Sequence, residues 1–157
     1  MKEEIAIIPY TGKYAKAIKE LNYEWILHYF KLEPGDIKSL NNPEKEILDK
    51  SGYIFYAIVN ENAVGVVTLL KISDTVYELS KMAVSSAYQG KGIGKRLIVH
   101  ALHFSKEKGF EKLVLYSNTK LVSAIHLYKN FGFYEVELET GLYERANIKM
   151  EKLLSFI

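Results

Sequence analysis

The chain contains no cysteine. This absence excludes disulfide bridges, thiolate zinc sites and a cysteine nucleophile, and it is compatible with a reducing compartment. No apolar run approaches the roughly 18 residues that a membrane span needs. The N-terminal residues also lack the hydrophobic segment of a signal peptide. We therefore expect a cytoplasmic protein without membrane contact.

The chain also lacks a strong excess of either charge. Its 21 Lys and Arg residues stand against 19 Asp and Glu residues, which gives a net charge of +2. No large basic surface therefore argues for nucleic acid as a partner. The four histidines fall in helical patterns without the spacing of metal ligands, so we expect no metal site. They are His28, His100, His103 and His126.

A length of 157 residues, 48% of them hydrophobic, predicts a single domain over residues 1–157. Hydrophobic periodicity and turn residues predict its elements. Helices are predicted over residues 13–30, 43–50, 93–108 and 120–130, with a break at Pro34-Gly35. Strands are predicted over residues 5–9, 53–59, 63–72, 75–84, 112–116, 133–139 and 147–153. Short connectors between residues 53 and 84 predict an antiparallel meander, so the fold class is α/β with a mixed sheet.

The most informative segment is Gln89–Gly94, in which every second residue is glycine. A helical pattern follows at once, so the segment exposes backbone N–H groups at the positive end of a helix dipole. This arrangement suits a phosphate or pyrophosphate, although a tight turn alone also explains the glycines. The segment has neither the Walker A spacing nor the Gly-x-Gly-x-x-Gly spacing of a dinucleotide site.

Two motifs place the segment in context. The pattern Gln89-x-x-Gly92-x-Gly94 follows a strand ending in Met82-Ala83-Val84, and a second pattern runs from Asn118 through Ala124, Leu127 and Tyr128 to Gly132-Phe133. Together they resemble the GNAT N-acetyltransferase family. The resemblance implies an α/β GNAT fold with a mixed, mostly antiparallel central sheet of six or seven strands and helices on both faces.

The resemblance also implies acetyl-CoA as the donor co-substrate. Loop amides would wrap the pyrophosphate, and the strand ending at Val84 would pair with the pantetheine arm. The implied cofactor-binding residues are Met82, Ala83, Val84, Gln89, Gly90, Lys91, Gly92, Ile93, Gly94, Lys95, Asn118 and Tyr128. Tyr128 would protonate the leaving thiolate, and a half-buried aromatic is the alternative reading. Asn118 would contact the cofactor, cap a helix, or both.

The acceptor amine must lose a proton before it attacks, because an alkylammonium is mostly charged at neutral pH. Glu78 stands where some relatives carry a catalytic glutamate. Strand alternation predicts that Glu78, Ser80 and Met82 share one face. Burial would raise the pKa of such a carboxyl and suit it to base catalysis. An exposed strand glutamate, with water as the base, is the alternative.

The sequence therefore predicts an acetyl-CoA-dependent N-acetyltransferase that transfers the acetyl group to a primary amine by direct attack in a ternary complex. The cofactor cleft would lie between the strands ending at Val84 and Tyr116. A different acyl donor or acceptor is one alternative, and a non-catalytic acyl-CoA-binding sensor is another. The acceptor is not identified, and a homodimer is compatible with the resemblance because similar proteins are often dimers.

Two further segments are candidates for the acceptor side. Trp25, Tyr29 and Phe30 lie on the first predicted helix and would line an acceptor pocket or pack in the core. The segment Tyr143-Glu144-Arg145 lies between the last two strands, where relatives often shape substrate entry.

Overall fold

The computed structural model of the protein describes residues 4–139 and 141–154. The two ends of the predicted 1–157 domain lie outside this range. The elements in chain order are β1 (Ala6–Pro9), α1 (Ala17–Tyr29), α2 (Pro34–Asn41), α3 (Pro43–Glu46), β2 (Tyr53–Val59), β3 (Asn62–Lys71), β4 (Val76–Val84), α4 (Ile93–Glu107), β5 (Lys112–Ser117), α5 (Val122–Asn130), β6 (Tyr134–Val136) and β7 (Ile148–Leu153). Short 3-10 turns cover Gly12–Tyr14, Leu48–Lys50 and Ser86–Tyr88. Within the described ranges, no helix is both long and apolar enough to cross a membrane.

The strands form one seven-stranded sheet in the order β1-β2-β3-β4-β5-β7-β6. Every neighbouring pair is antiparallel except β4 and β5, which run parallel. A parallel pair needs a crossover connection, and α4 supplies it between these two strands. The predicted mixed, mostly antiparallel sheet and its β2-β3-β4 meander are confirmed.

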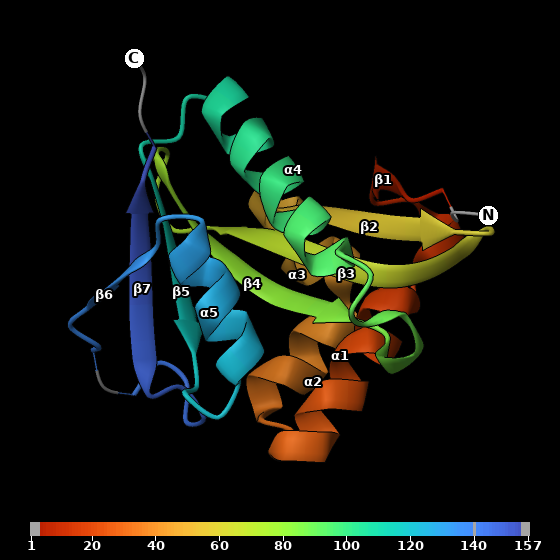
Figure 1. Cartoon of the computed structure of the whole chain (residues 1–157), viewed down its shortest axis with the longest axis horizontal. Helices are drawn as coiled ribbons and strands as arrows, with labels where there is room; N and C mark the ends of the chain where they lie inside the picture. Colours follow the sequence, from red (N-terminus) through yellow and green to blue (C-terminus); the bar gives the residue numbers. More distant parts are fainter. Residues whose placement is uncertain (1–3, 140, 155–157) are drawn as a thin grey trace.

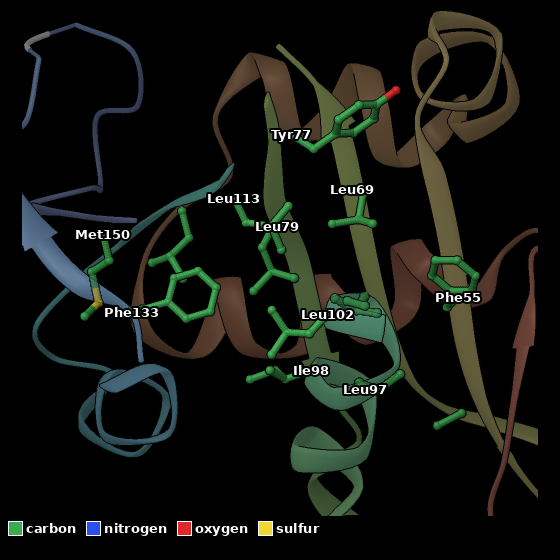
Figure 2. Packing of buried hydrophobic residues seen from close by; sticks show 14 of the residues in the cluster. Phe55, Leu69, Tyr77, Leu79, Leu97, Ile98, Leu102, Leu113, Phe133 and Met150 are labelled. Atoms are coloured by element: carbon green, nitrogen blue, oxygen red, sulfur yellow. The ribbon is translucent and has the colours of Figure 1, made fainter. Parts of the chain in front are cut away.

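Helices cover both faces of the sheet, as predicted (Figure 1). The helix α4 lies over one face, where a stripe of apolar residues is buried against the strands, namely Ile93, Leu97, Ile98, Ala101 and Leu102. Figure 2 shows Leu97, Ile98 and Leu102 of this stripe close to Leu69 and Leu79 of the sheet. A second cluster, built from α1, α2 and the segment around Ile47, packs against the other face. The sheet therefore separates two apolar layers.

The structure corrects several predicted boundaries. The first helix begins at Ala17 rather than residue 13, because a 3-10 turn precedes it. The predicted helix 43–50 divides into α3 and a 3-10 turn, α5 begins at Val122, and the predicted strand 133–139 is reduced to β6.

One helix, α2, was not predicted. Pro34 does not simply break the chain but occupies the first turn of α2, where its missing N–H costs nothing. The flanking carboxylates form a capping box, in which the backbone N–H of Glu33 donates to Asp36 Oδ2 at 2.8 Å. The correct reading of Pro34-Gly35 is therefore a helix start.

The parallel strands β4 and β5 stay together for only three residue pairs. Their register pairs Val76 with Lys112 and ends where Glu78 meets Val114. Beyond this point β4 remains paired with β3, and β5 with β7. The two strands therefore diverge along the rest of their length, as the predicted cleft requires.

A β-bulge interrupts β4 within the diverging part. Ser80 pairs with Thr68 and Ala83 with Val66, so Lys81 and Met82 together stand opposite one residue. Lys81 takes the left-handed backbone conformation, with φ of 47°. The extra residue shifts the alternation of side chains along the strand.

The bulge makes the predicted face assignment wrong beyond Ser80. Met82 packs with the cluster under α4, whereas Ala83 packs with the cluster under α1. Met82 therefore faces away from Glu78, and Ala83 faces the same side as Glu78.

The position before β2 requires glycine, Gly52, because other parts of the backbone approach it closely. A Cβ added there would lie 2.8 Å from the carbonyl oxygen of Ile47 and 2.9 Å from that of Leu69. We expect Gly52→Ala to lower the free energy of unfolding by about 2 kcal/mol, measured by urea denaturation. Gly35→Ala is the matched control, because an added Cβ meets nothing within 4 Å in α2. It should be neutral or stabilising by up to about 1 kcal/mol, and equal effects of both changes would contradict the packing argument.

Candidate active site

The divergence of β4 from β5 opens a cavity of about 720 Å³, which is large enough for a cofactor-sized ligand. Its walls come from β4, the glycine segment, the end of β5, α5, α1, α2 and the segment before β7. Segments that are far apart in sequence therefore meet around one space.

Most of the predicted cofactor-binding residues line this cavity. They are Met82, Ala83, Val84, Gln89, Gly90, Gly92, Ile93, Gly94, Asn118 and Tyr128. Lys91 and Lys95 belong to the same segment but are not among the residues that line the cavity. The Nζ atom of Lys91 instead lies 5.0 Å from the ring centre of Tyr88.

The glycine segment turns the chain into α4. Gly90 and Gly92 have φ of 80° and 79°, a conformation in which other residues are strained, and Gly92 is the N-cap of the helix. A Cβ at either position would meet no protein atom within 4 Å. Glycine is therefore favoured there by the left-handed backbone and not by lack of space. A Cβ on Gly94 would approach Met82 Cε to 3.3 Å, because the start of α4 packs directly on β4. The first amides of the helix are thus held at the edge of the cavity, where they favour an anion.

Tyr128 of α5 lines the same cavity and is half-buried. Its ring makes an edge-to-face contact with Phe133 at 6.0 Å between ring centres. Burial raises the pKa of Tyr128 to about 12, so its hydroxyl is protonated at neutral pH. The position suits a proton donor to a group inside the cleft.

Asn118 is not the N-cap of α5, since the N-cap residue is Leu121, so the alternative reading of Asn118 as a helix cap is wrong. Its Oδ1 accepts a hydrogen bond from the backbone N–H of Lys120 at 2.9 Å. Its Nδ2 donates to the carbonyl oxygen of Arg145 at 2.7 Å. Asn118 therefore forms a turn before α5 and ties it to the segment that precedes β7.

Glu78 is 6% exposed and lines the cavity, so the alternative of an exposed strand glutamate is wrong. The hydroxyl of Tyr143 donates to its two carboxylate oxygens at 3.1 and 2.9 Å. Burial raises the pKa of Glu78, although the Tyr143 hydrogen bond and the charge of Lys81 partly oppose the shift. The raised pKa makes the carboxylate a stronger base than an exposed glutamate, so it is suited to accept a proton.

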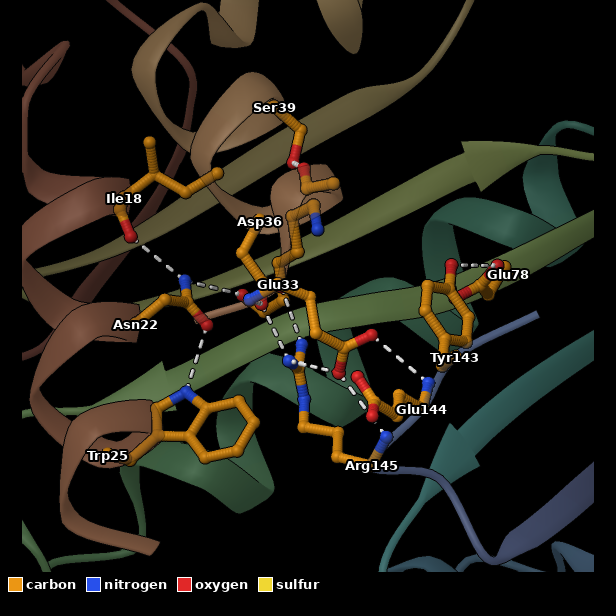
Figure 3. A network of polar contacts seen from close by, with 12 residues as sticks. Ile18, Asn22, Trp25, Glu33, Asp36, Ser39, Glu78, Tyr143, Glu144 and Arg145 are labelled. Carbon is orange, nitrogen blue, oxygen red and sulfur yellow. Dashed lines mark hydrogen bonds and ion pairs between the residues drawn. The ribbon is translucent and has the colours of Figure 1, made fainter. Parts of the chain in front are cut away.

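A buried ion cluster joins the two segments that flank this end of the cavity (Figure 3). Arg145 donates through Nη1 and Nη2 to both oxygens of Asp36 at 2.6 Å, and through Nη1 to Glu33 at 3.0 Å. The backbone N–H groups of Glu144 and Arg145 donate to Glu33 as well. Burial alone would raise the pKa of Asp36, but these hydrogen bonds outweigh it and hold the pKa below its ordinary value.

The cluster reaches the bulge in β4 through two side chains of α1. The guanidinium of Arg145 lies over the Trp25 ring at 5.6 Å from its centre. Trp25 Nε1 donates to Asn22 Oδ1 at 3.0 Å, and Asn22 Nδ2 donates to the carbonyl oxygen of Lys81 at 3.2 Å. Sequence reasoning missed Asn22 and Asp36, which are both almost fully buried. A polar residue on an apolar helix face was the available signal for Asn22.

The weaker acceptor-side candidates also lie at this cavity. Trp25, Tyr29 and Phe30 line it from α1, and Tyr143 and Arg145 line it from the segment before β7. Over the described ranges, no three His, Asp or Glu side chains gather as a metal site would require.

A sequence profile of the acetyltransferase (GNAT) family matches residues 18–133, which is more than half of the chain. The chain belongs to this family. The match extends from α1 through the glycine segment and Tyr128 to Phe133, so it includes both motifs that carried the predicted resemblance.

Individual relatives agree with this assignment. The uncharacterized N-acetyltransferase YvbK of Bacillus subtilis (strain 168) is 29% identical over 101 residues, which cover 62% of this chain and 65% of YvbK. A GNAT acetyltransferase from Staphylococcus aureus Mu50 superimposes with a TM-score of 0.87 at 27% identity, over 97% of this chain and all of its own. The PaiA N-acetyltransferase of Thermoplasma acidophilum, solved in complex with coenzyme A, has a TM-score of 0.75 at 19% identity over 96% and 99% of the two chains. The match to YvbK thus spans less than two thirds of that curated relative.

The ion cluster makes a testable contribution to stability. We expect Arg145→Met to lower the free energy of unfolding at pH 7 by about 3 kcal/mol, because two largely buried carboxylates lose their counter-charge. The difference should shrink at acid pH, since the stabilisation from ionised Asp36 is lost as the pH falls through its lowered pKa.

Denaturation at pH 7 and at pH 3 measures both effects. The exposed Arg96 of α4 provides the control, and Arg96→Met should change stability by less than about 0.5 kcal/mol. A loss for Arg145→Met that is no larger than this would show that the cluster does not stabilise the fold.

Proposed function

We propose that the protein is an acetyl-CoA-dependent N-acetyltransferase, in which a primary amine attacks the thioester directly in a ternary complex. The observation that carries the proposal is the composition of the single cleft between β4 and β5. Helix-terminal amides lie at one part of it, and a buried carboxylate with a raised pKa lies at another. The family assignment and the coenzyme A complex of the T. acidophilum relative support acetyl-CoA as the donor.

The donor is proposed to bind mainly through the backbone. Amides of Gln89–Gly94 hold the pyrophosphate at the start of α4. Among the described residues, no strand pairs with the β5-facing edge of β4 beyond Glu78. Backbone groups of this edge that no strand pairs with therefore suit the amides of the pantetheine arm, which would extend the sheet over Met82–Val84. The carbonyl oxygen of Val84 now accepts a hydrogen bond from Gln89 Nε2 at 3.3 Å, which the arm would displace. An N–H of this edge would also polarise the thioester carbonyl.

The acceptor is proposed to enter from the α1 and α2 side, where Glu78 accepts a proton from the ammonium, directly or through water. The free amine then attacks the carbonyl carbon, the C–S bond breaks, and Tyr128 protonates the leaving thiolate. The second proton that the amine nitrogen loses returns to the Tyr128 oxygen through water. The products are an N-acetyl amine and CoA. The cytoplasmic location and the homodimer stay predictions from the sequence.

The role of Tyr128 is tested by thiol release from acetyl-CoA with a panel of amines, amino acids and peptides. We expect Tyr128→Phe to lower kcat by about 100-fold, because it removes a positioned general acid, without loss of acetyl-CoA binding in calorimetry. Tyr134 is exposed on β6 and gives the control variant Tyr134→Phe, which should retain full activity. Unchanged turnover by Tyr128→Phe across pH would sink this mechanism. Tight acetyl-CoA binding without turnover of any amine would instead indicate a sensor.

The variant Glu78→Gln separates the contribution of Glu78 to catalysis from its effect on the stability of the fold. We expect kcat/KM to fall about 100-fold and the decrease of the wild-type rate toward low pH to disappear. The native pKa of Glu78 is raised, so its ionisation destabilises the fold as the pH rises through that pKa. The variant should therefore melt above the wild type at pH 8, and the difference should vanish toward pH 4.

Glu135→Gln on β6 is the control, since Glu135 is exposed. It should leave the rate profile and the melting temperature unchanged at both pH values. A Glu78→Gln variant with wild-type kinetics would leave water as the base.

A further inference from the structure

The acceptor side of the cleft is unusually rich in charge for a space lined by Trp25, Tyr143 and Leu40. Two carboxylates, Asp36 and Glu78, line it together with the cations Lys81, Lys120 and Arg145. Some of these charged groups already have partners within the protein. The groups without such partners remain available to a ligand.

The anionic groups and Arg145 are satisfied within the fold. Glu33 accepts hydrogen bonds from two backbone N–H groups and from Arg145. Asp36 accepts two from Arg145 and one from the backbone of Glu33. Glu78 accepts from Tyr143 and lines the cavity. The guanidinium thus uses three of its five N–H donors on two carboxylates, and these carboxylates also neutralise its charge.

The ammonium group of Lys81 differs from these groups. Across residues 4–139 and 141–154, no hydrogen bond or ion pair within 4 Å satisfies its Nζ. Asp36 and Glu78 act on it only at longer range, and burial lowers the pKa of Lys81 against their effect. Lys120 also lines the cavity, but it is exposed and lies over the Phe30 ring.

The bulge explains why Lys81 is on this side. A regular strand would place residues 78 and 81 on opposite faces. The extra residue and the left-handed backbone of Lys81 bring its charge into the field of Glu78 and Asp36. Asn22 holds the carbonyl oxygen of Lys81 and so fixes this conformation. Glu78 and Lys81, three residues apart, thus both line one cavity.

We propose that the acceptor is an α-amino acid or a close analogue, whose amine meets Glu78 while its carboxylate accepts hydrogen bonds from Lys81. This inference rests on the proposed acetyl transfer. A zwitterion complements both groups and brings no net charge into the cleft, whereas a plain amine supplies no counter-charge to the ammonium of Lys81. Leu40, Ile26 and Trp25 line the remaining space and suit an apolar acceptor side chain.

Matched acceptors test the carboxylate. Thiol release at pH 8 is measured with phenylalanine, phenylalanine amide and phenethylamine, and with leucine, leucinamide and isoamylamine. We expect kcat/KM for each amino acid to exceed that for its amide and its decarboxylated amine by about tenfold or more. The amide has the more readily deprotonated amine, so intrinsic reactivity works against this order.

Variants then assign the preference to one side chain. Lys81→Gln should abolish it, and Lys81→Arg should retain most of it, with acetyl-CoA binding unchanged in calorimetry. Lys71 pairs with Asp74 in an exposed turn, so Lys71→Gln is the control and should keep the wild-type preference.

The outcomes separate the two proposals. Turnover of amines without a preference for the carboxylate, or a preference that survives Lys81→Gln, overturns this inference and leaves acetyl transfer standing. Thiol release with none of the amines overturns the proposed function and this inference together. If Lys81→Gln does not fold, the wild-type enzyme alone decides. A preference for the acceptors with a carboxylate then supports the inference, and its absence overturns the inference.

Discussion

The parting of β4 from β5 after Glu78 is the constraint on which the rest of the site depends. Two parallel strands that stayed paired would satisfy each other's backbone and leave no space between them. Because the register ends after three pairs, β4 presents an unpaired edge and β5 carries its end away toward α5. The residues at the start of α4, Tyr128 and Glu78 all line the resulting cavity.

The second organising interaction is the cluster of Arg145 with Glu33 and Asp36. It fixes the start of α2 against the segment before β7, two pieces of chain more than one hundred residues apart. Through Trp25 and Asn22 the same polar chain reaches the carbonyl of the bulge (Figure 3). The acceptor side of the cleft is therefore held by side-chain contacts, whereas the proposed donor side depends mainly on the backbone.

This difference explains what the sequence could predict. The glycine segment, the strand ending at Val84 and the helix carrying Tyr128 are local patterns, so composition, turn residues and the family resemblance predict them. The contact of Tyr143 with Glu78 joins residues that are 65 positions apart, so no local sequence pattern predicts it. Strand alternation also failed after Ser80, because a bulge is a property of the pairing with β3 and not of β4 alone. The capping box at Glu33 and Asp36 is a local pattern as well, but the pair Pro34-Gly35 between them predicts a break in its place.

Lys81 combines two unfavourable features in one residue. Its left-handed backbone is costly for a side chain other than glycine, by roughly 1 kcal/mol, and its buried ammonium has no close counter-ion. Both burdens would disappear with glycine or asparagine at this position, so selection for heat resistance alone would favour replacing it. Laboratory evolution for thermostability alone would thus select for replacement of Lys81 and would change this side of the cleft. Stability screens of this protein therefore need an activity measurement beside the melting temperature.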